Sequence, residues 1–200
     1  HAPLYYNGKY HLFYQHNPFG PFWHQIHWGH WVSDDMVHWK HVKEAIAPEA
    51  GDLAPDGIWS GGASVDRDGN PVLFITAGND SDKPNQRVAI YRPVNLDDPY
   101  LTEWTPLYPE PVIKQQQGQG DFGEFRDPFV WKDENENRWY LIIGSGTNNN
   151  NGGTALLYTS EDLEHWEYHG NFFESDADKY PFLGEHWELP VLLPVKSEDG

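Results

Sequence analysis

The heptapeptide Ser33-Asp34-Asp35-Met36-Val37-His38-Trp39 recurs as Ser160-Glu161-Asp162-Leu163-Glu164-His165-Trp166, with a looser copy over residues 95–104. Ahead of each copy, a polar turn leads into a run of aromatic and aliphatic residues, as in Asn7-Gly8-Lys9-Tyr10-His11-Leu12-Phe13-Tyr14. These turns fall at positions 8, 69, 136 and 200, so the intervals between them are 61, 67 and 64 residues. Short strands and turns repeated at a nearly constant period predict the blades of a β-propeller.

Each repeat has the pattern of four antiparallel strands. An inner strand ends at a turn that contains Gly or Asn, and a second strand follows, which is the signal of a tight hairpin. A third strand is predicted over residues 28–33, 88–92 and 155–160, and a Trp after an Asp-rich turn opens the fourth. No segment has the 3.6-residue periodicity of a helix, so the predicted fold class is all-β.

The chain contains three repeats and the start of another, which ends at the turn Glu198-Asp199-Gly200. Propellers typically need about 4–8 blades to close, and an open stack would leave unpaired strand edges. We therefore expect residues 1–200 to form a partial propeller domain, about three blades and the start of a fourth, of a longer protein.

The 200 residues carry a formal net charge of −18 and contain no cysteine. Nucleic acids and anionic membranes attract basic surfaces, so this charge argues against both as partners. No run of about 18 apolar residues occurs, so no membrane span is expected. The composition favours a neutral substrate, and the 16% of aromatic residues can supply both core packing and stacking surfaces for sugar rings.

The first residues of the inner strands are the candidates for chemistry. Inner strands line the central channel of a propeller, so equivalent positions in successive blades converge at one end of its axis. These positions hold His1, Trp59, Ser60, Arg126, Asp127 and Glu188, with prolines close behind at Pro3, Pro128 and Pro190. Polar side chains that gather at the mouth of a rigid scaffold indicate a functional site.

Two carboxylic acids at one site suggest glycoside hydrolysis. Glu188 lies between an aromatic and an aliphatic residue, surroundings that favour a protonated carboxyl, so it is the candidate acid. Asp127 follows Arg126, so we expect it to be the ionised carboxylate. Neighbouring strand residues point to opposite faces, so Arg126 and Asp127 can both face the channel only if the strand is irregular there, which Pro128 allows.

Five blocks of the chain carry a family resemblance: Tyr10–Pro18 (YHLFYQHNP), Trp28–Trp39, Gly57–Gly61 (GIWSG), Phe125–Pro128 (FRDP) and Trp187–Pro190 (WELP). Together, and in this order, they resemble glycoside hydrolase family 32, which includes invertases, inulinases, levanases and related fructosyltransferases. The resemblance implies a five-bladed β-propeller, usually followed by a β-sandwich. It also implies a secreted, retaining hydrolase that cleaves β-fructofuranosidic bonds in sucrose or a fructan, without a metal or organic cofactor.

The resemblance assigns roles to individual residues. Glu188 would be the general acid/base, Asp127 would stabilise the transition state, and Arg126 would orient the substrate. The sugar pocket would be lined by Gln15, Trp23, Trp59 and Ser60, with His1 at the subsite beside the nucleophile. By register, the nucleophilic Asp of the family would stand two positions before His1, outside this chain, so the chain alone cannot perform a double displacement.

Departures from the family pattern leave alternatives open. Leu189 and Val191 stand where the family usually has Cys and Asp, so a fructosyltransferase is an alternative to a hydrolase. A related arabinofuranosidase is a second alternative, although the blocks around Gln15 and Trp59 argue against it. A fructan-binding propeller without a nucleophile is a third. The series His24, His27 and His30 invites a metal site, but these side chains would not share one face of an extended segment, so none is expected.

Overall fold

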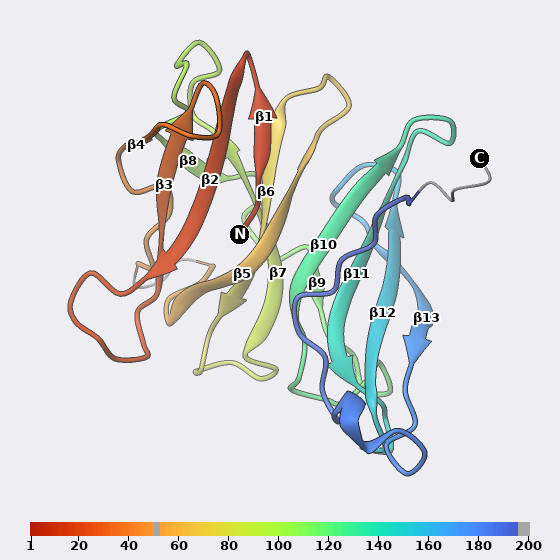
Figure 1. The fold of residues 1–200 in the computed structure, drawn as a ribbon. Coiled ribbons are helices and arrows are strands. Elements are labelled where there is room, and N and C mark those ends of the chain that lie inside the picture. The colour runs from red at the N-terminus through yellow and green to blue at the C-terminus, as the bar shows by residue number, and fades with distance from the viewer. Residues whose placement is uncertain (50–52, 196–200) are drawn as a thin grey trace.

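The computed structural model describes residues 1–49 and 53–195, which form three antiparallel sheets (Figure 1). The first sheet contains β1 (Leu4–Tyr6), β2 (Lys9–His16), β3 (His27–Ser33) and β4 (Trp39–His41). The second contains β5 (Gly57–Val65), β6 (Pro71–Gly78), β7 (Gln86–Pro93), β8 (Trp104–Pro106) and β9 (Ile113–Lys114). The third contains β10 (Arg126–Asp133), β11 (Arg138–Gly146), β12 (Gly153–Ser160) and β13 (Glu167–Glu174).

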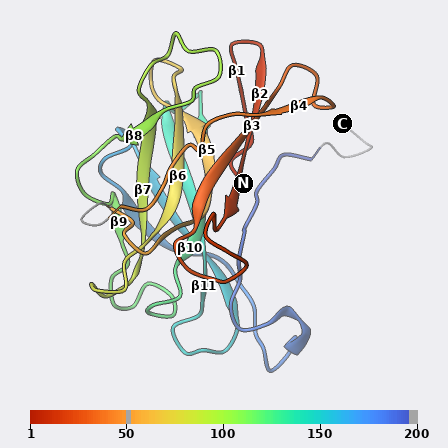
Figure 2. The same cartoon turned by 90° about the vertical axis from the view of Figure 1, so that its left-hand side faces the viewer.

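Strands that follow one another in sequence are neighbours in each sheet, apart from the short β9, which pairs with β7. Each sheet is therefore one blade, and the prediction of an all-β partial propeller is confirmed. Figure 2 views the stack of blades from the side of the first one. Within the described ranges, η1 (Pro181–Leu183) is the one helical turn, and no helix there is long and apolar enough to cross a membrane.

The second blade is sandwiched between the other two, which is why β6 is buried along its whole length. Alternate residues of a strand face opposite sides of the sheet. Leu73 and Ile75 accordingly pack with Phe13 of the first blade, whereas Phe74 packs with Trp139 of the third. Burying each such side chain contributes on the order of 1.5–3 kcal/mol, so packing between blades is a main source of stability.

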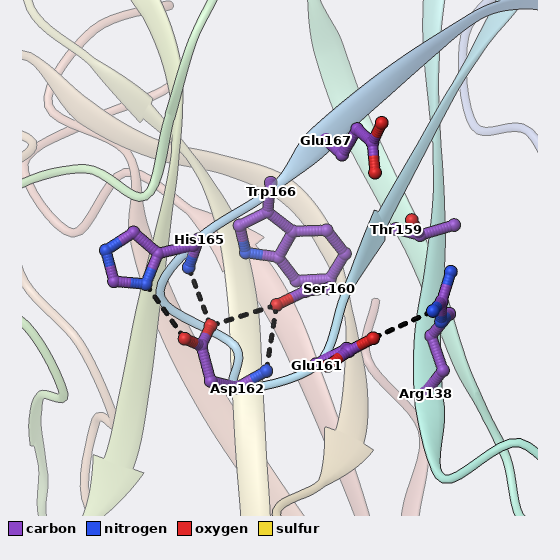
Figure 3. Close-up of a pocket in the computed structure, with 8 residues that line it drawn as sticks. All are labelled: Arg138, Thr159, Ser160, Glu161, Asp162, His165, Trp166 and Glu167. Atoms are coloured by element: carbon purple, nitrogen blue, oxygen red, sulfur yellow. Dashed lines mark hydrogen bonds and ion pairs between the residues drawn. The ribbon is translucent and has the colours of Figure 1, made fainter.

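The recurring heptapeptide forms the turn between the third and fourth strands. The Ser33 hydroxyl accepts the N–H of Met36 at 2.9 Å, and the Asp35 carboxylate accepts the N–H of His38 at 2.7 Å. The copy at Ser160 and Asp162 makes the same bonds, as Figure 3 shows in part. The repeat is thus explained by a turn that satisfies its own backbone donors.

The structure departs from the predicted strands in two places. Residues 184–195, where the inner strand of a fourth blade was expected, have no strand assigned, since no second strand of that blade lies among the described residues to pair with them. β9, which was not predicted, adds two residues to the second blade through Ile113 opposite Val88. The predicted turn at residues 198–200 lies outside the described residues.

Two histidines are buried in the first blade. Nδ1 of His11 lies 3.0 Å from Nε2 of His30, and the ring of Phe13 stacks on His30 with centroids 4.3 Å apart. Burial lowers the pKa of His11 to about 4 and that of His30 to about 3. The folded blade therefore holds both imidazoles in their neutral form, in which one can donate a proton to the other.

This pair makes stability depend on pH. Below about pH 6.5 these histidines bind protons in the unfolded chain but stay neutral in the folded blade. The free energy of unfolding therefore falls as the pH falls towards about 4. His30→Gln retains an amide at the position of Nε2 but cannot titrate. We expect urea unfolding between pH 6.5 and 4.5 to give a shallower pH dependence for this variant, by about 1 kcal/mol per pH unit; an unchanged slope would contradict this account.

Candidate active site

A cavity of about 370 Å³ is shared between the blades at the end where β10 begins. It is lined by Gln15, Trp23, Trp59, Ser60, Gln86, Glu124, Arg126, Asp127, Glu188 and Leu189. Seven of these residues were singled out from the sequence, and the fold brings them together from three blades and the segment after η1. Gln86, Glu124 and Leu189 were not among the predicted site residues.

The beginning of β10 is irregular. Arg126 pairs with Gly144, but the next pair is Phe129 with Ile142, so one strand has an extra residue there. Asp127 has a φ of +65°, in the left-handed region that residues other than glycine rarely adopt. This irregularity lets Arg126 and Asp127 both line the cavity, as the sequence analysis required.

β5 has the same kind of break. Trp59 pairs with Thr76 and Gly61 with Ile75, so Ser60 is the extra residue. A Cβ on Gly61 would lie 1.9 Å from the carbonyl oxygen of Phe74, which means that this close approach requires glycine. The bulge places Trp59 and Ser60 on the cavity together, and the Ser60 hydroxyl donates to Oε1 of Gln15 at 3.0 Å.

A shared backbone conformation links three of the strand starts. Ala2, Asp127 and Leu189 have φ values of +44°, +65° and +51°, and each stands directly before a proline. The residues before them are His1, Arg126 and Glu188. The three positions thus share a backbone conformation as well as a sequence pattern. His1, however, does not reach the cavity: it lines a neighbouring hollow of about 330 Å³ that shares only Asp127 and Leu189 with it.

Arg126 connects the acidic groups of the cavity. Its Nε donates to Oε1 of Glu188 at 2.8 Å, and its Nη1 donates to Oε1 of Gln86 at 3.1 Å and to the carboxylate of Glu124. The Glu188 side chain is 60% exposed. The cation thus contacts Glu188 directly, whereas the sequence suggested apolar surroundings for this residue. Of its two neighbours in sequence, Trp187 stacks on Phe173 and only Leu189 lines the same cavity.

Asp127 is the buried acid, with 6% of its surface exposed. Its Oδ2 accepts the N–H of Leu189 at 2.9 Å, and its own N–H donates to the Thr76 hydroxyl at 2.8 Å. Burial raises the pKa of Asp127 above its ordinary value, against the opposing effects of this hydrogen bond and of Arg126. Asp127 was expected to be the ionised carboxylate because it follows Arg126; the Arg126 charge does favour ionisation, but burial has the larger and opposite effect on its pKa.

The segment that carries Glu188 is held against β11 rather than paired in a sheet. The N–H of Trp187 donates to the carbonyl oxygen of Ser145 at 3.1 Å, and His186 lies 2.8 Å from a carboxylate oxygen of Asp121. A Cβ on Gly144 would lie 2.2 Å from the Trp187 carbonyl oxygen, so the backbone can pass here only because residue 144 is glycine. These contacts fix the position of Glu188 relative to Arg126.

Two tryptophans form the aromatic wall. The rings of Trp23 and Trp59 lie 5.7 Å apart, and Trp23 is 67% exposed. The loop that carries Trp23 is tied by Asn17, whose Nδ2 donates to the carbonyl oxygen of His24 at 2.7 Å. An exposed aromatic face beside carboxylates and amides is suited to a ligand with both apolar ring faces and hydroxyl groups.

A second hollow, of about 380 Å³, lies at the outer edge of the third blade (Figure 3). Its polar groups are already paired: Arg138 with Glu161 at 2.8 Å, and His165 with Asp162 at 2.8 Å. The first blade has the equivalent pairs Lys9–Asp34 and His38–Asp35, so these contacts belong to the repeated architecture. Since these charged groups pair with one another in both blades, they explain the hollow as part of the blade structure and do not indicate a reactive centre there.

The histidine series does not converge on one point. His27 lies 3.0 Å from a carboxylate oxygen of Glu44, whereas His30 contacts His11. Over residues 1–49 and 53–195, no group of three or more His, Asp or Glu side chains is arranged to hold a metal ion.

Comparison with known proteins identifies the family of this chain. The model of the "Glycosyl hydrolases family 32 N-terminal domain" matches residues 1–200. The chain belongs to glycosyl hydrolase family 32. The resemblance seen in the five sequence blocks is thereby confirmed.

Members of family 32 similar to this chain differ in their named activities. A β-fructofuranosidase of Oryza sativa subsp. indica, insoluble isoenzyme 3, is 36% identical over 202 residues, covering 100% of this chain and 32% of the relative. The fructan 6-exohydrolase of Beta vulgaris is 34% identical, covering 97% and 31%. The crystal structure of fructan 1-exohydrolase IIa from Cichorium intybus matches with a TM-score of 0.81 at 34% identity, covering 94% and 33%. The chain spans about a third of the length of these family 32 proteins.

The buried acid gives a prediction about stability. Burial raises the pKa of Asp127 in the folded state above the ordinary value of 3.8. At pH values above 3.8, ionisation of Asp127 therefore lowers the free energy of unfolding. Asp127→Asn keeps an acceptor for the Leu189 N–H and removes the charge. We expect the variant to be more stable than the unsubstituted protein in urea at pH 7, with the gain vanishing near pH 3. A variant that is less stable at pH 7 would show that the charged form is favoured by its partners.

Proposed function

We propose that this chain forms part of the catalytic propeller of a retaining glycoside hydrolase that cleaves β-fructofuranosidic bonds in sucrose or fructans. The observation that carries the proposal is the pairing of two dissimilar acids at one cavity: Asp127, buried, and Glu188, accessible and bound to Arg126. A retaining glycosidase needs one carboxyl group that gives up a proton and another that stays charged and attacks the sugar. Glu188 suits the first role, the Asp expected before His1 would take the second, and Asp127 is a further carboxyl group at the same cavity.

Each residue has a role in the proposed reaction. Glu188 protonates the glycosidic oxygen as the leaving group departs and later takes a proton from the attacking water. Asp127 accepts hydrogen bonds from hydroxyl groups of the fructose ring, and Arg126 holds the Glu188 carboxylate in place. Trp59 and Gln15 complete the binding surface for the sugar. We expect the nucleophile to be an Asp two positions before His1: its carboxylate would bond to the anomeric carbon as the leaving group departs, and water would later displace it, which restores the configuration.

The names of the relatives support a substrate that contains fructose, but they do not single out one glycosidic linkage. Their names cover β-fructofuranosidase, fructan 1-exohydrolase and fructan 6-exohydrolase at 34–36% identity. A substituted form of the Cichorium intybus enzyme has been crystallised in complex with 1-kestose. We therefore propose a substrate that ends in a β-linked fructose. Several relatives are named insoluble isoenzymes, which supports the further proposal that the protein acts outside the cell.

The direct test is to incubate the full-length protein with sucrose, 1-kestose and levan, to follow products by chromatography, and to follow the configuration at the anomeric carbon C2 of the released fructose by carbon NMR early in the reaction. Release of fructose with retained configuration is the expected result. Growth of longer oligosaccharides at high sucrose concentration would instead favour the fructosyltransferase. Binding of intact substrate without products would favour a fructan-binding propeller.

Glu188→Gln tests the proposed acid. The amide keeps the shape of the side chain but cannot donate a proton, so kcat for sucrose should fall by about 10²–10⁴-fold while KM changes little. Glu185→Gln is the matched control, since it makes the same change on the same exposed segment outside the cavity. Activity of Glu188→Gln within a few-fold of the control would show that Glu188 is not the acid/base.

A further inference from the structure

Glu124 is the acidic residue of the cavity that the proposed reaction leaves without a role. It shares the Arg126 guanidinium with Glu188: Nη1 of Arg126 donates to Glu124, and Nε donates to Glu188 at 2.8 Å. Glu124 stands two residues before Arg126, just ahead of β10, and its carboxylate reaches the guanidinium of that first strand residue. One cation therefore lies between two carboxylates.

The chain holds Glu124 in place from both sides. Its N–H donates to the carbonyl oxygen of Asp121 at 3.0 Å, and its carbonyl oxygen accepts the Ser145 hydroxyl at 2.6 Å. Phe125, the next residue, is completely buried. The backbone around Glu124 is thus anchored in the third blade, which places its side chain within reach of the guanidinium.

Gln86 completes this arrangement. Its Oε1 accepts from Nη1 of Arg126 at 3.1 Å and from the N–H of Phe125 at 3.0 Å, while its Nε2 donates to the carbonyl oxygen of Gly123 at 2.7 Å. The Gln86 side chain therefore makes three hydrogen bonds to the segment that carries Glu124 and Arg126. This buried amide locks the two charged residues in one relative orientation.

The charges of the cavity explain why a further acid is useful. A positive charge beside a carboxyl group favours its ionised form, but a general acid must hold a proton when the substrate binds. The charged groups near Glu188 are Arg126 and Asp127 on β10, Glu124 before that strand, and Glu185 and His186 on its own segment, with Asp121 opposite His186. Of these, Glu124 is the group that binds the same guanidinium and opposes its charge.

We propose that Glu124 is a positioning residue that orients Arg126 and offsets its positive charge, so that Glu188 can carry a proton at the working pH. This role rests on the proposed function, because it assumes that Glu188 is the acid. Glu124 acts through Arg126 and does not itself bind the fructose ring.

Glu124→Gln in the full-length protein tests this role, because the amide can still accept from Nη1 but has no charge. With the negative charge gone, Arg126 favours loss of the proton from the acid, and the basic limb of the kcat profile for sucrose should move to lower pH by about 0.5–1 unit. Above the pH optimum, kcat should fall by about 3–10-fold, while KM stays within about two-fold. Glu124→Asp, which keeps the charge, should leave the basic limb near its original position.

The control is Glu134→Gln, which removes the same charge near the other end of β10, where Glu134 pairs with Lys132 at 3.4 Å. An unmoved basic limb in Glu124→Gln, with sucrose still cleaved by the unsubstituted protein, would overturn the role of Glu124 alone. A rise in KM without a shift of the limb would also overturn it, because Glu124 would then contact the substrate. Absence of cleavage by the unsubstituted protein would overturn the proposed function and this role together.

Discussion

The left-handed backbone of Asp127, directly before Pro128, is the constraint on which the site depends. A regular strand would direct Arg126 and Asp127 to opposite faces, so one of them would be lost from the cavity. The extra residue between the Arg126 and Phe129 pairs removes this conflict. Strain of this kind persists only where the surrounding structure fixes it, and here the Thr76 hydroxyl and the Leu189 N–H hold Asp127 on both sides.

Irregular backbone also marks the other strand starts around the channel. Ala2 and Leu189 repeat the conformation of Asp127, and β5 has its own bulge at Ser60. Because each blade begins its inner strand with an irregularity, each can direct polar groups to the end of the channel while the rest of the strand packs against its neighbours. Burial of β6 on both faces supplies the rigid support for that geometry.

Much of this could be predicted from the sequence. The repeated turns predicted the blades. The polar residues before Pro128 and Pro190, together with Gln15, Trp23, Trp59 and Ser60 from the family resemblance, are seven of the ten residues that line the cavity. Gln86 and Glu124 were missed, because their part in the site depends on where Arg126 directs its guanidinium. The position of Glu124 two residues before Arg126 was a usable signal, whereas Gln86 had only the weak signal of an amide at the edge of an apolar strand. The burial of Asp127 and the direct contact of Glu188 with Arg126 were not foreseen, since neighbours in sequence do not report burial in three dimensions.

The central claim is that the cavity between Asp127 and Glu188 binds the fructose unit. The most direct measurement is a crystal structure of the full-length protein soaked with fructose. The account predicts fructose in this cavity, with its hydroxyl groups about 2.6–3.2 Å from the Asp127 carboxylate and its anomeric carbon on the side of Glu188. Fructose bound elsewhere, with this cavity empty at a saturating concentration, would contradict it.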